Sequence, residues 1–358
     1  MIKTKNPPST KGGIIINYQN AVKSADTHLL AAASKLYGLD GYEFSAINAH
    51  GGGRNLVYNC VKGEETKKIL RISFLSDRSK EDFLAETEYI RYLHDNGSSV
   101  ANVIGSLQGN LVEEITYNGS VFFVVLFDKA KDKMFWENGY KYREGVSITE
   151  YYYNCGKVLG KIHQLSKEYK PKHKRYDFFD KFNTGYINKL IPDSYSLLKM
   201  KMTALIKVLE GLEKNRETFG MIHFDFNDGN YFIDFDTGQI TVYDFDNSCY
   251  CWYLFDLASV WGNGTGWIQH EKSAEKRKEF MDEYFKIVLD GYKSETAISD
   301  TVLDDLPIFF KANLVEGIVS HFECLRDGDN DGIEEEWVTN AIKCLEEDIP
   351  YKGFYHEI

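Results

Sequence analysis

The sequence predicts an α+β fold of two lobes, with a small β-rich N-terminal lobe and a larger, mainly helical C-terminal lobe. In the first 130 residues, short strand-like runs alternate with glycine and Asn-Gly turns. After residue 130, most apolar positions recur at helical spacing. The exception is Met221–Asn247, where short strand-like runs carry a set of polar residues. We place the lobe boundary near Ala130, so residues 1–130 form the first lobe and residues 131–358 the second.

The composition limits the class of protein. The 358 residues carry 42 basic and 54 acidic side chains, a net charge of −12, which argues against non-specific binding to nucleic acid or to an anionic membrane. The six cysteines form no C-x-x-C pair, and the N-terminus lacks the apolar run of a signal peptide. No stretch of about 18 apolar residues could span a membrane. We therefore expect a cytoplasmic monomer or homodimer without a nucleic-acid or membrane partner.

The first lobe is expected to begin with an additional helix over about 18–37, ended by Gly38. A long amphipathic helix over 78–97 follows later, and an Asn118-Gly119 turn joins the last two strands as a hairpin. The predicted strands are 43–48, 55–61, 68–73, 111–117 and 121–127.

Glycines and charged residues of the first lobe suggest contacts with phosphate. Gly51, Gly52 and Gly53 lie between two predicted strands, where glycine lets the backbone approach phosphate, although a plain hairpin turn explains them equally well. Arg71 lies on the third strand with apolar neighbours, and its fork of N–H groups suits phosphate oxygens. An exposed arginine on an edge strand is the alternative. Two acidic residues of the following helix are candidate partners of Arg71, Glu86 as the first choice and Glu88 as the second, and either could instead be a solvated helix charge.

The second lobe is expected to be built from helices. The segment Phe127–Lys131, with Asp128 and Ala130, is the expected connector between the lobes. The predicted helices are 149–168, 194–219, 253–260, 270–292, 303–325 and 333–346.

The segment Met221–Asn247 carries the groups that phosphoryl transfer needs. His223, Asp225 and Asn230 form an H-x-D-x-x-x-x-N pattern, and a strand over 240–243 then leads to Asp244-Phe245-Asp246. Such a reaction requires one carboxylate to accept the proton of the attacking hydroxyl, and an amide and a second carboxylate to hold metal ions. A surface hairpin with solvated Asp and Asn is the alternative. The interleaved apolar residues and the three nearby carboxylates argue against it, because the carboxylates would repel one another without a cation.

This segment resembles the aminoglycoside phosphotransferase and choline kinase family, which shares the protein-kinase-like fold. The resemblance rests on His223-Phe224-Asp225, on Asn230, on Tyr243-Asp244-Phe245-Asp246, and on Phe255-Asp256-Leu257-Ala258. It is strongest for the bacterial branch that contains stress-response kinases and type II homoserine kinases. Phe224 departs from the family pattern, which has glycine there, and phenylalanine does not adopt a positive φ as readily as glycine does.

The resemblance implies a kinase that moves the γ-phosphate of ATP, or of GTP, to a hydroxyl group of a small molecule. It implies that Asp225 is the catalytic base and that Asn230 and Asp244 hold Mg²⁺. His223 and Asp256 would support the catalytic loop, and Asp246 would either assist the metal or stabilise its own turn. The nucleotide would contact a larger set: Arg71, Glu86, Gly51, Gly52, Gly53, Asp128 and Ala130.

The acceptor is the open part of this hypothesis. An aminoglycoside-like, choline-like or homoserine-like compound would fit, and the acidic net charge favours a cationic one. Residues of the last hundred positions are candidate contacts: Trp261, Trp267, Glu316, His321 and Trp337. A Ser/Thr protein kinase and a nucleotide-binding pseudokinase remain alternative functions. The acidic run 327–332 lacks the twelfth-position Glu of a calcium loop, so a solvated turn is the default.

Overall fold

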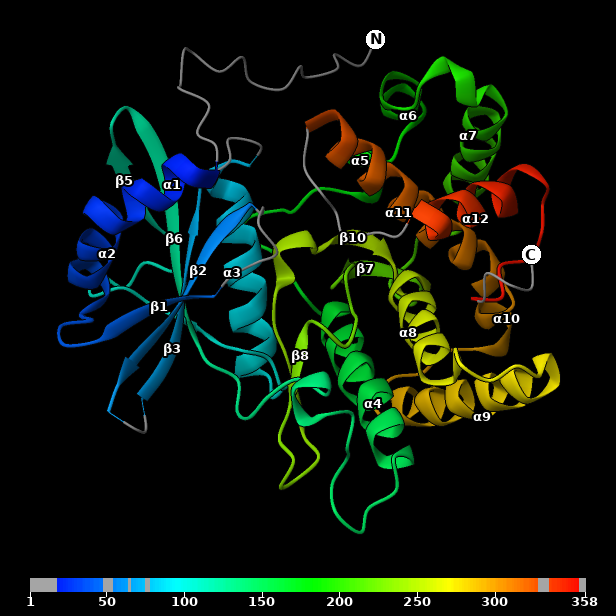
Figure 1. The fold of residues 1–358 in the computed structure, drawn as a ribbon, viewed down its shortest axis with the longest axis horizontal. Helices are drawn as coiled ribbons and strands as arrows, with labels where there is room; N and C mark the ends of the chain where they lie inside the picture. The colour runs from blue at the N-terminus through cyan, green and yellow to red at the C-terminus, as the bar shows by residue number, and fades with distance from the viewer. Residues whose placement is uncertain (1–17, 48–53, 64–65, 75–77, 328–334, 354–358) are drawn as a thin grey trace. The chain divides into compact units, whose positions relative to one another are not determined.

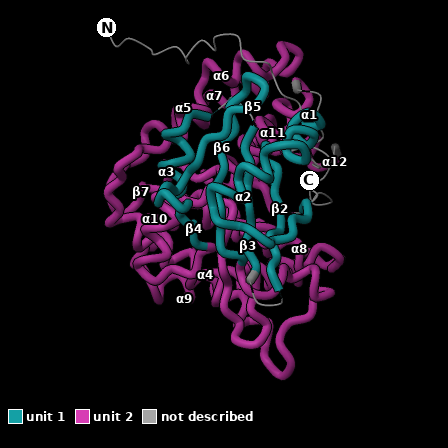
Figure 2. Tube along the Cα trace, turned by 90° about the vertical axis from the view of Figure 1, so that its left-hand side faces the viewer, with its two compact units in different colours: residues 1–87, 102–129 teal, residues 88–101, 130–358 magenta. Residues whose placement is uncertain are grey.

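The computed structural model describes residues 18–47, 54–63, 66–74, 78–327 and 335–353. Its contacts divide the chain into two compact units, which Figure 2 colours separately. The first unit comprises Met1–Thr87 and Asn102–Lys129, and the second comprises Glu88–Ala101 and Ala130–Ile358. Helix α3, Lys80–Asp95, therefore has residues in both units.

The first unit begins with the expected helix, which is interrupted by one wider turn. Helix α1 covers Tyr18–Ser24, a π-helical turn covers Ala25–Leu29, and α2 covers Leu30–Tyr37. Gly38 ends α2 with a φ of 64°, a conformation that glycine adopts without the clash of a side chain. The face of these helices that packs into the core is small and apolar: Ala21, Ala25, Leu29 and Ala33.

A six-stranded antiparallel sheet forms the rest of the first unit (Figure 1). Strand β3 lies inside the order β1-β2-β3-β6-β4, and β5 pairs with β6. The predicted hairpin is confirmed, because Tyr117 pairs with Ser120 across Asn118 and Gly119, whose φ values are 50° and 78°. The strands are β1 (Glu43–Ile47), β2 (Asn55–Lys62), β3 (Thr66–Ser73), β4 (Val103–Ile104), β5 (Glu113–Tyr117) and β6 (Ser120–Asp128). The two-residue β4 was not predicted.

The second unit is mainly helical, as predicted, and contains two small two-stranded sheets (Figure 1). Its principal helices are α4 (Thr149–Ser166), α5 (Phe178–Lys181), α6 (Thr184–Leu190), α7 (Ser196–Glu210), α8 (Tyr253–Ile268), α9 (Ala274–Lys293), α10 (Asp300–Leu303), α11 (Leu306–Asp327) and α12 (Glu335–Glu346). Strand β7 (Phe219–Ile222) pairs with β10 (Cys249–Trp252), and β8 (Tyr231–Ile233) pairs with β9 (Ile240–Val242). None of the described helices is long and apolar enough to cross a membrane.

Three predicted helices of the second unit have clearly different bounds in the structure. The helix predicted over 253–260 continues to Ile268. The helix predicted over 194–219 ends at Glu210, and Phe219 begins β7 instead, because these residues pair with β10. The helix predicted over 303–325 is divided into α10 and α11. Pro307 lies in the first turn of α11, where its missing N–H costs no hydrogen bond. Distant strand pairing and a local helix start were the features that periodicity did not reveal.

Helices α4 and α9 touch backbone to backbone, and this contact supports the candidate site. A Cβ atom added at Gly156 would lie 1.8 Å from the carbonyl oxygen of Val288, and one at Gly291 would lie 2.0 Å from that of Tyr153. No side chain larger than hydrogen fits at either position. The close approach brings Tyr292 of α9 against His163 of α4, whose ring nitrogen Nδ1 lies 2.9 Å from the tyrosine hydroxyl.

Candidate active site

The predicted catalytic loop runs from His223 to Asn230, between strands β7 and β8. Pairing of Ile222 with Cys249 holds its start, and pairing of Tyr231 with Val242 holds its end. Because strands fix both ends, this short irregular segment has a defined path.

Asp225 is held within this loop by two neutral amides. The Nδ2 group of Asn227 donates to Oδ1 at 2.7 Å, and that of Asn230 donates to Oδ2 at 2.9 Å. Asn230 also donates to the backbone carbonyl of Asp225 at 2.8 Å. Burial raises the pKa of Asp225, while His223 and the two amides act in the opposite direction. The carboxylate is thus oriented without being neutralised by a cation.

Asp256 of α8 holds the backbone of the same loop through its carboxylate. Its fully buried carboxylate accepts the N–H groups of His223 and Phe224, both at 2.9 Å. It also lies 3.2 Å from Nε2 of His163, whose other nitrogen contacts Tyr292. Burial lowers the pKa of His163. His163 is fully buried, and both of its ring nitrogens lie within hydrogen-bond distance of a side chain.

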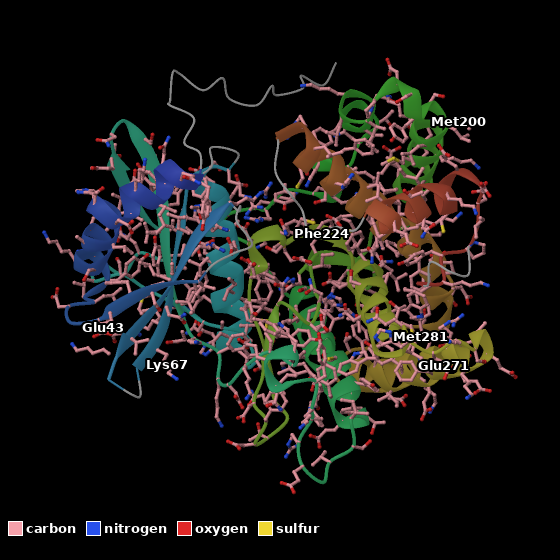
Figure 3. The ribbon with its side chains drawn as sticks, viewed as in Figure 1. Glu43, Lys67, Met200, Phe224, Glu271 and Met281 are labelled. Atoms are coloured by element: carbon pink, nitrogen blue, oxygen red, sulfur yellow. The ribbon has the colours of Figure 1, made fainter. Side chains whose placement is uncertain are left out.

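Phe224 adopts a positive φ of 74°, although it occupies the position where the family pattern has glycine. Its ring stacks on Phe255 of α8, with the centroids 4.4 Å apart and the planes 7° from parallel. Figure 3 labels Phe224 near β10 and α8. The aromatic stack and the hydrogen bond to Asp256 offset the backbone strain of a non-glycine residue, which is typically 1–3 kcal/mol. The backbone therefore keeps a path that glycine would adopt more easily.

Asp244 follows β9 and is brought close to the catalytic loop through Tyr243. The N–H of Tyr243 donates to the carbonyl of Asn230 at 2.9 Å, and Nε2 of His223 donates to the carbonyl of Tyr243 at 2.9 Å. Asp244 itself is exposed, and its backbone adopts the left-handed conformation, with a φ of 62°. His223 thus links the loop to the Asp244 turn, which is the supporting position that the sequence suggested for it.

Asp246 is buried in a 3-10 turn, Phe245–Asn247, that Arg175 holds. The buried Arg175 donates from Nε to the carbonyl of Ser248 at 2.7 Å and from Nη2 to the carbonyl of Asp246. Sequence reasoning missed Arg175, since it lies in the polar stretch 170–185 and carries no motif. After this turn the chain continues directly into β10 and then α8, so regular secondary structure follows Asn247 almost without a break.

Arg71 of the first unit forms a buried, bidentate ion pair with Glu86. The two terminal nitrogens of Arg71 each lie 2.8 Å from one carboxylate oxygen. Arg71 is 5 % exposed and lies on the interior strand β3, so the alternative of an exposed arginine on an edge strand is wrong. Glu88 instead accepts a hydrogen bond from His173, 2.9 Å away.

The remaining predicted nucleotide contacts are less defined. The Asp128 side chain is exposed, 4.0 Å from Lys68, and its backbone N–H donates to Asn102. Ala130 is the partly buried first residue of the second segment of the second unit. Gly51, Gly52 and Gly53 lie outside the described residues, as does most of the acidic run 327–332.

The candidate acceptor contacts separate into different environments. Trp267 packs edge-on against Phe135, with the ring centroids 4.8 Å apart. Trp261 and Trp337 line a cavity of the second unit. Glu316 lies on α11, and burial is the main reason that its pKa is raised to about 7, with a further contribution from Asp225.

Comparison with known proteins connects this geometry to a family. Residues 46–295 match the phosphotransferase enzyme family. The chain belongs to that family. It is therefore a phosphotransferase, a small-molecule kinase with an alcohol group as acceptor, and the family resemblance read from the sequence is confirmed.

The phosphotransferase is similar to several characterised kinases along most of its length. It is 27 % identical over 338 residues to an amicoumacin kinase of Bacillus subtilis (strain 168), covering 92 % of this chain and 94 % of that protein. A structure of an amicoumacin kinase in complex with AMP-PNP, Ca²⁺ and Ami superposes with a TM-score of 0.76 at 23 % identity, covering 95 % and 99 % of the two chains. A microcompartment-associated aminopropanol kinase gives 0.59 at 19 % identity, covering 91 % and 94 %. These superpositions establish the kinase-like fold.

Proposed function

We propose that this phosphotransferase moves the γ-phosphate of ATP to a hydroxyl group of an amine-bearing small molecule, with Asp225 as the catalytic base. The observation that carries the proposal is the way Asp225 is held. Two neutral amides bind its oxygens, so the carboxylate is oriented without a paired cation that neutralises it. A base needs both properties, since it must point at the hydroxyl and must accept its proton.

In the proposed reaction, the acceptor oxygen attacks the γ-phosphorus while its proton passes to the Asp225 carboxylate. The bond between the γ-phosphorus and the bridging oxygen breaks, and ADP leaves with the electron pair. Positioning and charge stabilisation supply most of the rate in this chemistry. Asp256 contributes indirectly by fixing the loop backbone through the N–H groups of His223 and Phe224.

Asn230 and Asp244 are the proposed ligands of a magnesium ion. Among the described residues, no group of three or more His, Cys, Asp or Glu side chains could hold a metal by itself. Mg²⁺ suits a site with few protein ligands, because it commonly takes one or two protein oxygens together with phosphate oxygens and water. The Asn230 amide donates its N–H groups to Asp225, which leaves its oxygen as the ligand atom. Bound there, the ion would neutralise charge on the phosphates.

ATP is proposed as the donor nucleotide, with GTP as the alternative. Support comes from the amicoumacin kinase complex, which holds AMP-PNP and Ca²⁺. In the present chain, Arg71 is the proposed phosphate contact, and Glu86 fixes the orientation of its guanidinium group.

An amine on the acceptor is supported by the charges around the catalytic loop. Glu316 has a pKa of about 7 and interacts electrostatically with Asp225 and Glu323, which raise that pKa, and with Lys181, which lowers it. An ammonium group near these carboxylates would favour their ionised forms. Among the structural neighbours, the names aminopropanol kinase and choline kinase refer to alcohols that carry an amine or a quaternary ammonium group.

The test is an ADP-release assay with Mg²⁺ and a panel of acceptors: aminopropanol, choline, ethanolamine, homoserine, methylthioribose and aminoglycosides. Turnover that requires an acceptor and disappears in Asp225→Asn is the expected result. Acceptor-dependent turnover that persists in this variant would overturn the role of Asp225. Binding of ATP without turnover of any acceptor would contradict the proposed acceptor class.

A further inference from the structure

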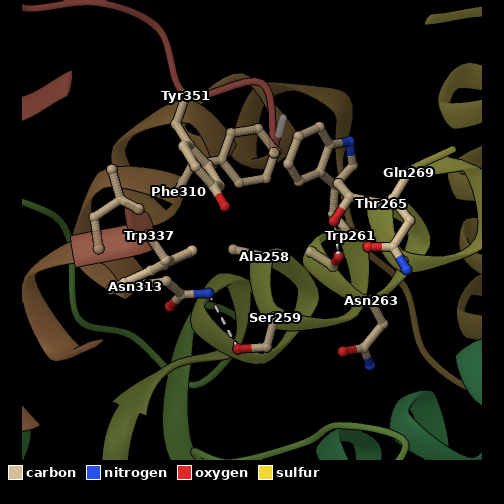
Figure 4. A pocket seen from close by; sticks show the side chains of 14 residues that line it. Ala258, Ser259, Trp261, Asn263, Thr265, Gln269, Phe310, Asn313, Trp337 and Tyr351 are labelled. Atoms are coloured by element: carbon tan, nitrogen blue, oxygen red, sulfur yellow. Dashed lines mark hydrogen bonds between the residues drawn. The ribbon is translucent and has the colours of Figure 1, made fainter. Parts of the chain in front are cut away.

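A cavity of about 420 Å³ lies within the second unit, among α8, α11, α12 and residues 351–353 (Figure 4). Its apolar walls are mainly aromatic, with Trp261, Phe310, Trp337 and Tyr351. The ring centroids of Trp261 and Phe310 lie 4.4 Å apart. Flat, rigid side chains of this kind present their faces to a planar ligand at little cost in side-chain entropy. The volume is in the range of small-molecule pockets.

The polar part of the cavity wall is uncharged. Three carboxamides line it, Asn263, Gln269 and Asn313, and each group can donate and accept hydrogen bonds. Asn313 donates to Ser259 across the cavity wall at 3.1 Å, and no partner is found for Asn263 or Gln269 among the described residues. No acidic or basic side chain belongs to the described lining. A charged group bound against this wall would find no ion-pair partner among the described lining residues, so the wall favours a neutral group with its own hydrogen-bonding atoms.

Two glycines of α8 keep the cavity open. A Cβ atom added at Gly262 or Gly266 would meet nothing within 4 Å, whereas one at Gly264 would lie 2.5 Å from the ring of Tyr284. Glycine inside a helix costs about 1 kcal/mol relative to alanine. At Gly264, close packing against Tyr284 explains why glycine is needed despite this cost. At Gly262 and Gly266 the space in front of the backbone is open, Gly266 being exposed to solvent, and both residues line the cavity.

The cavity begins close to the residues that hold the catalytic loop. On α8, its lining residues Ala258 and Ser259 follow Asp256 within one helical turn, about 5.4 Å of rise. On α11, Asn313 precedes Glu316 by three residues, and Glu316 interacts electrostatically with Asp225. Both helices therefore connect the cavity wall to the surroundings of Asp225 within about one turn.

We infer that this cavity binds a neutral, planar aromatic group that carries an amide or hydroxyl. Resting on the proposed function, we assign this group to the non-reacting end of the acceptor, whose amine and reactive hydroxyl lie toward Glu316 and Asp225. The two ends of the acceptor would then contact two different environments, a charged one at the catalytic loop and an aromatic, uncharged one along α8.

Benzamide is the probe for this site, because it is planar, neutral and carries both a donor and an acceptor. We expect saturable binding to the full chain by saturation-transfer NMR, and affinities at least about tenfold weaker for cyclohexanecarboxamide and benzoate, which lack the planar ring and the neutral charge, respectively. Gly262→Leu should abolish benzamide binding by filling the cavity. Gly262→Ala, which has nearly the same helix-forming gain but a small side chain, should retain it.

Gly266→Leu provides a second blocking variant if Gly262→Leu lowers the melting temperature. Benzamide binding unchanged in folded forms of both leucine variants, or no saturable binding to the wild type, would overturn the inference. Asp225→Asn separates the two proposals, since it should retain benzamide binding while losing phosphoryl transfer. For an acceptor found in the panel, Gly262→Leu should raise the KM for the acceptor and leave the KM for ATP unchanged. An unchanged acceptor KM would remove the assignment to the acceptor.

Discussion

Glu86 in the first unit and Asp225 in the second are both carboxylates whose two oxygens accept side-chain N–H groups. Glu86 is bound by the guanidinium group of Arg71, with both distances 2.8 Å. Asp225 is bound by the amides of Asn227 and Asn230, at 2.7 and 2.9 Å. The hydrogen bonds are similar in number and length, but only the first pair neutralises the carboxylate.

This difference shows that the charge of the partner decides whether a hydrogen-bonded carboxylate serves mainly stability or mainly the reaction. A bidentate ion pair fixes both side chains, and the guanidinium group balances the charge of the carboxylate. Neutral amide donors fix the orientation and leave the charge available for reaction. Glu86 should therefore contribute mainly to stability and to the position of Arg71, whereas Asp225 should contribute mainly to the reaction rate.

The largest expected effect is on activity at Asp225. Asp225→Asn should lower kcat by about 10²–10⁴-fold, the usual contribution of a general base. The free energy of unfolding should stay within about 1 kcal/mol of the wild type, because the variant removes a partly buried charge and perturbs one amide contact. Steady-state ADP release and urea denaturation measure the two quantities. A loss of rate below threefold would contradict the comparison.

Glu86 should show the opposite behaviour. Glu86→Gln removes the carboxylate that binds the buried Arg71, and breaking a buried ion pair typically costs about 3–5 kcal/mol. The urea midpoint should therefore fall strongly. Glu88→Gln is the matched control, since Glu88 sits two residues away and is partly exposed beside His173. Equal urea midpoints for the two variants would show that the ion pair between Arg71 and Glu86 contributes no more to stability than the contact of Glu88 with His173.

Glu316 offers an intermediate case, a carboxylate with no hydrogen-bond partner found among the described residues. Its pKa of about 7 means that it is mostly protonated at pH 6 and mostly ionised at pH 8. With an accepted substrate whose ammonium charge does not titrate in this range, kcat/KM should rise by up to about tenfold from pH 6 to pH 8, since an ionised carboxylate attracts the cation. Asp225, Glu323 and Lys181 are the charged groups that act on it.

Glu316→Gln should flatten that pH profile while leaving kcat at pH 6 nearly unchanged. An equally steep rise in the glutamine variant would assign the pH dependence to another group.

The smallest expected effect concerns the backbone beside Asp225. Phe224→Ala and Phe224→Gly both lose the stack on Phe255, but only glycine relieves the strain of a positive φ. The glycine variant should therefore be more stable than the alanine variant by about 1 kcal/mol. At Phe255, which is helical, alanine should be more stable than glycine. Denaturation of the four variants tests this reversal, and alanine being more stable at both positions would contradict it.

Much of the fold was predictable from the sequence, because its signals are local. The Asn118-Gly119 hairpin, the glycine that ends α2 and the helical spacing in α4 each depend on residues close in the chain. The pairing of Arg71 with Glu86 followed from family resemblance. Strands β7 and β10 escaped prediction, since their residues become strands only by pairing with each other.

The supports of the candidate site were less predictable than its central residues. Asp225, Asn230 and Asp244 stand at fixed offsets in one segment, so a motif reveals them. Arg175 lies about seventy residues before the turn that it holds, and Tyr292 lies 129 positions from His163. Such contacts depend on how helices pack, and no local pattern records them.

The sequence by itself determined the family, the order of elements and the chemical groups of the catalytic segment, because spacing and residue type are read directly from the chain. The tertiary structure decided which charges are paired, that Phe224 adopts a glycine-like backbone, and that α8 and α11 enclose an aromatic cavity. The physical reason is that burial, ion pairing and cavity shape arise from contacts between segments distant in sequence, whose geometry is fixed only when the whole unit packs.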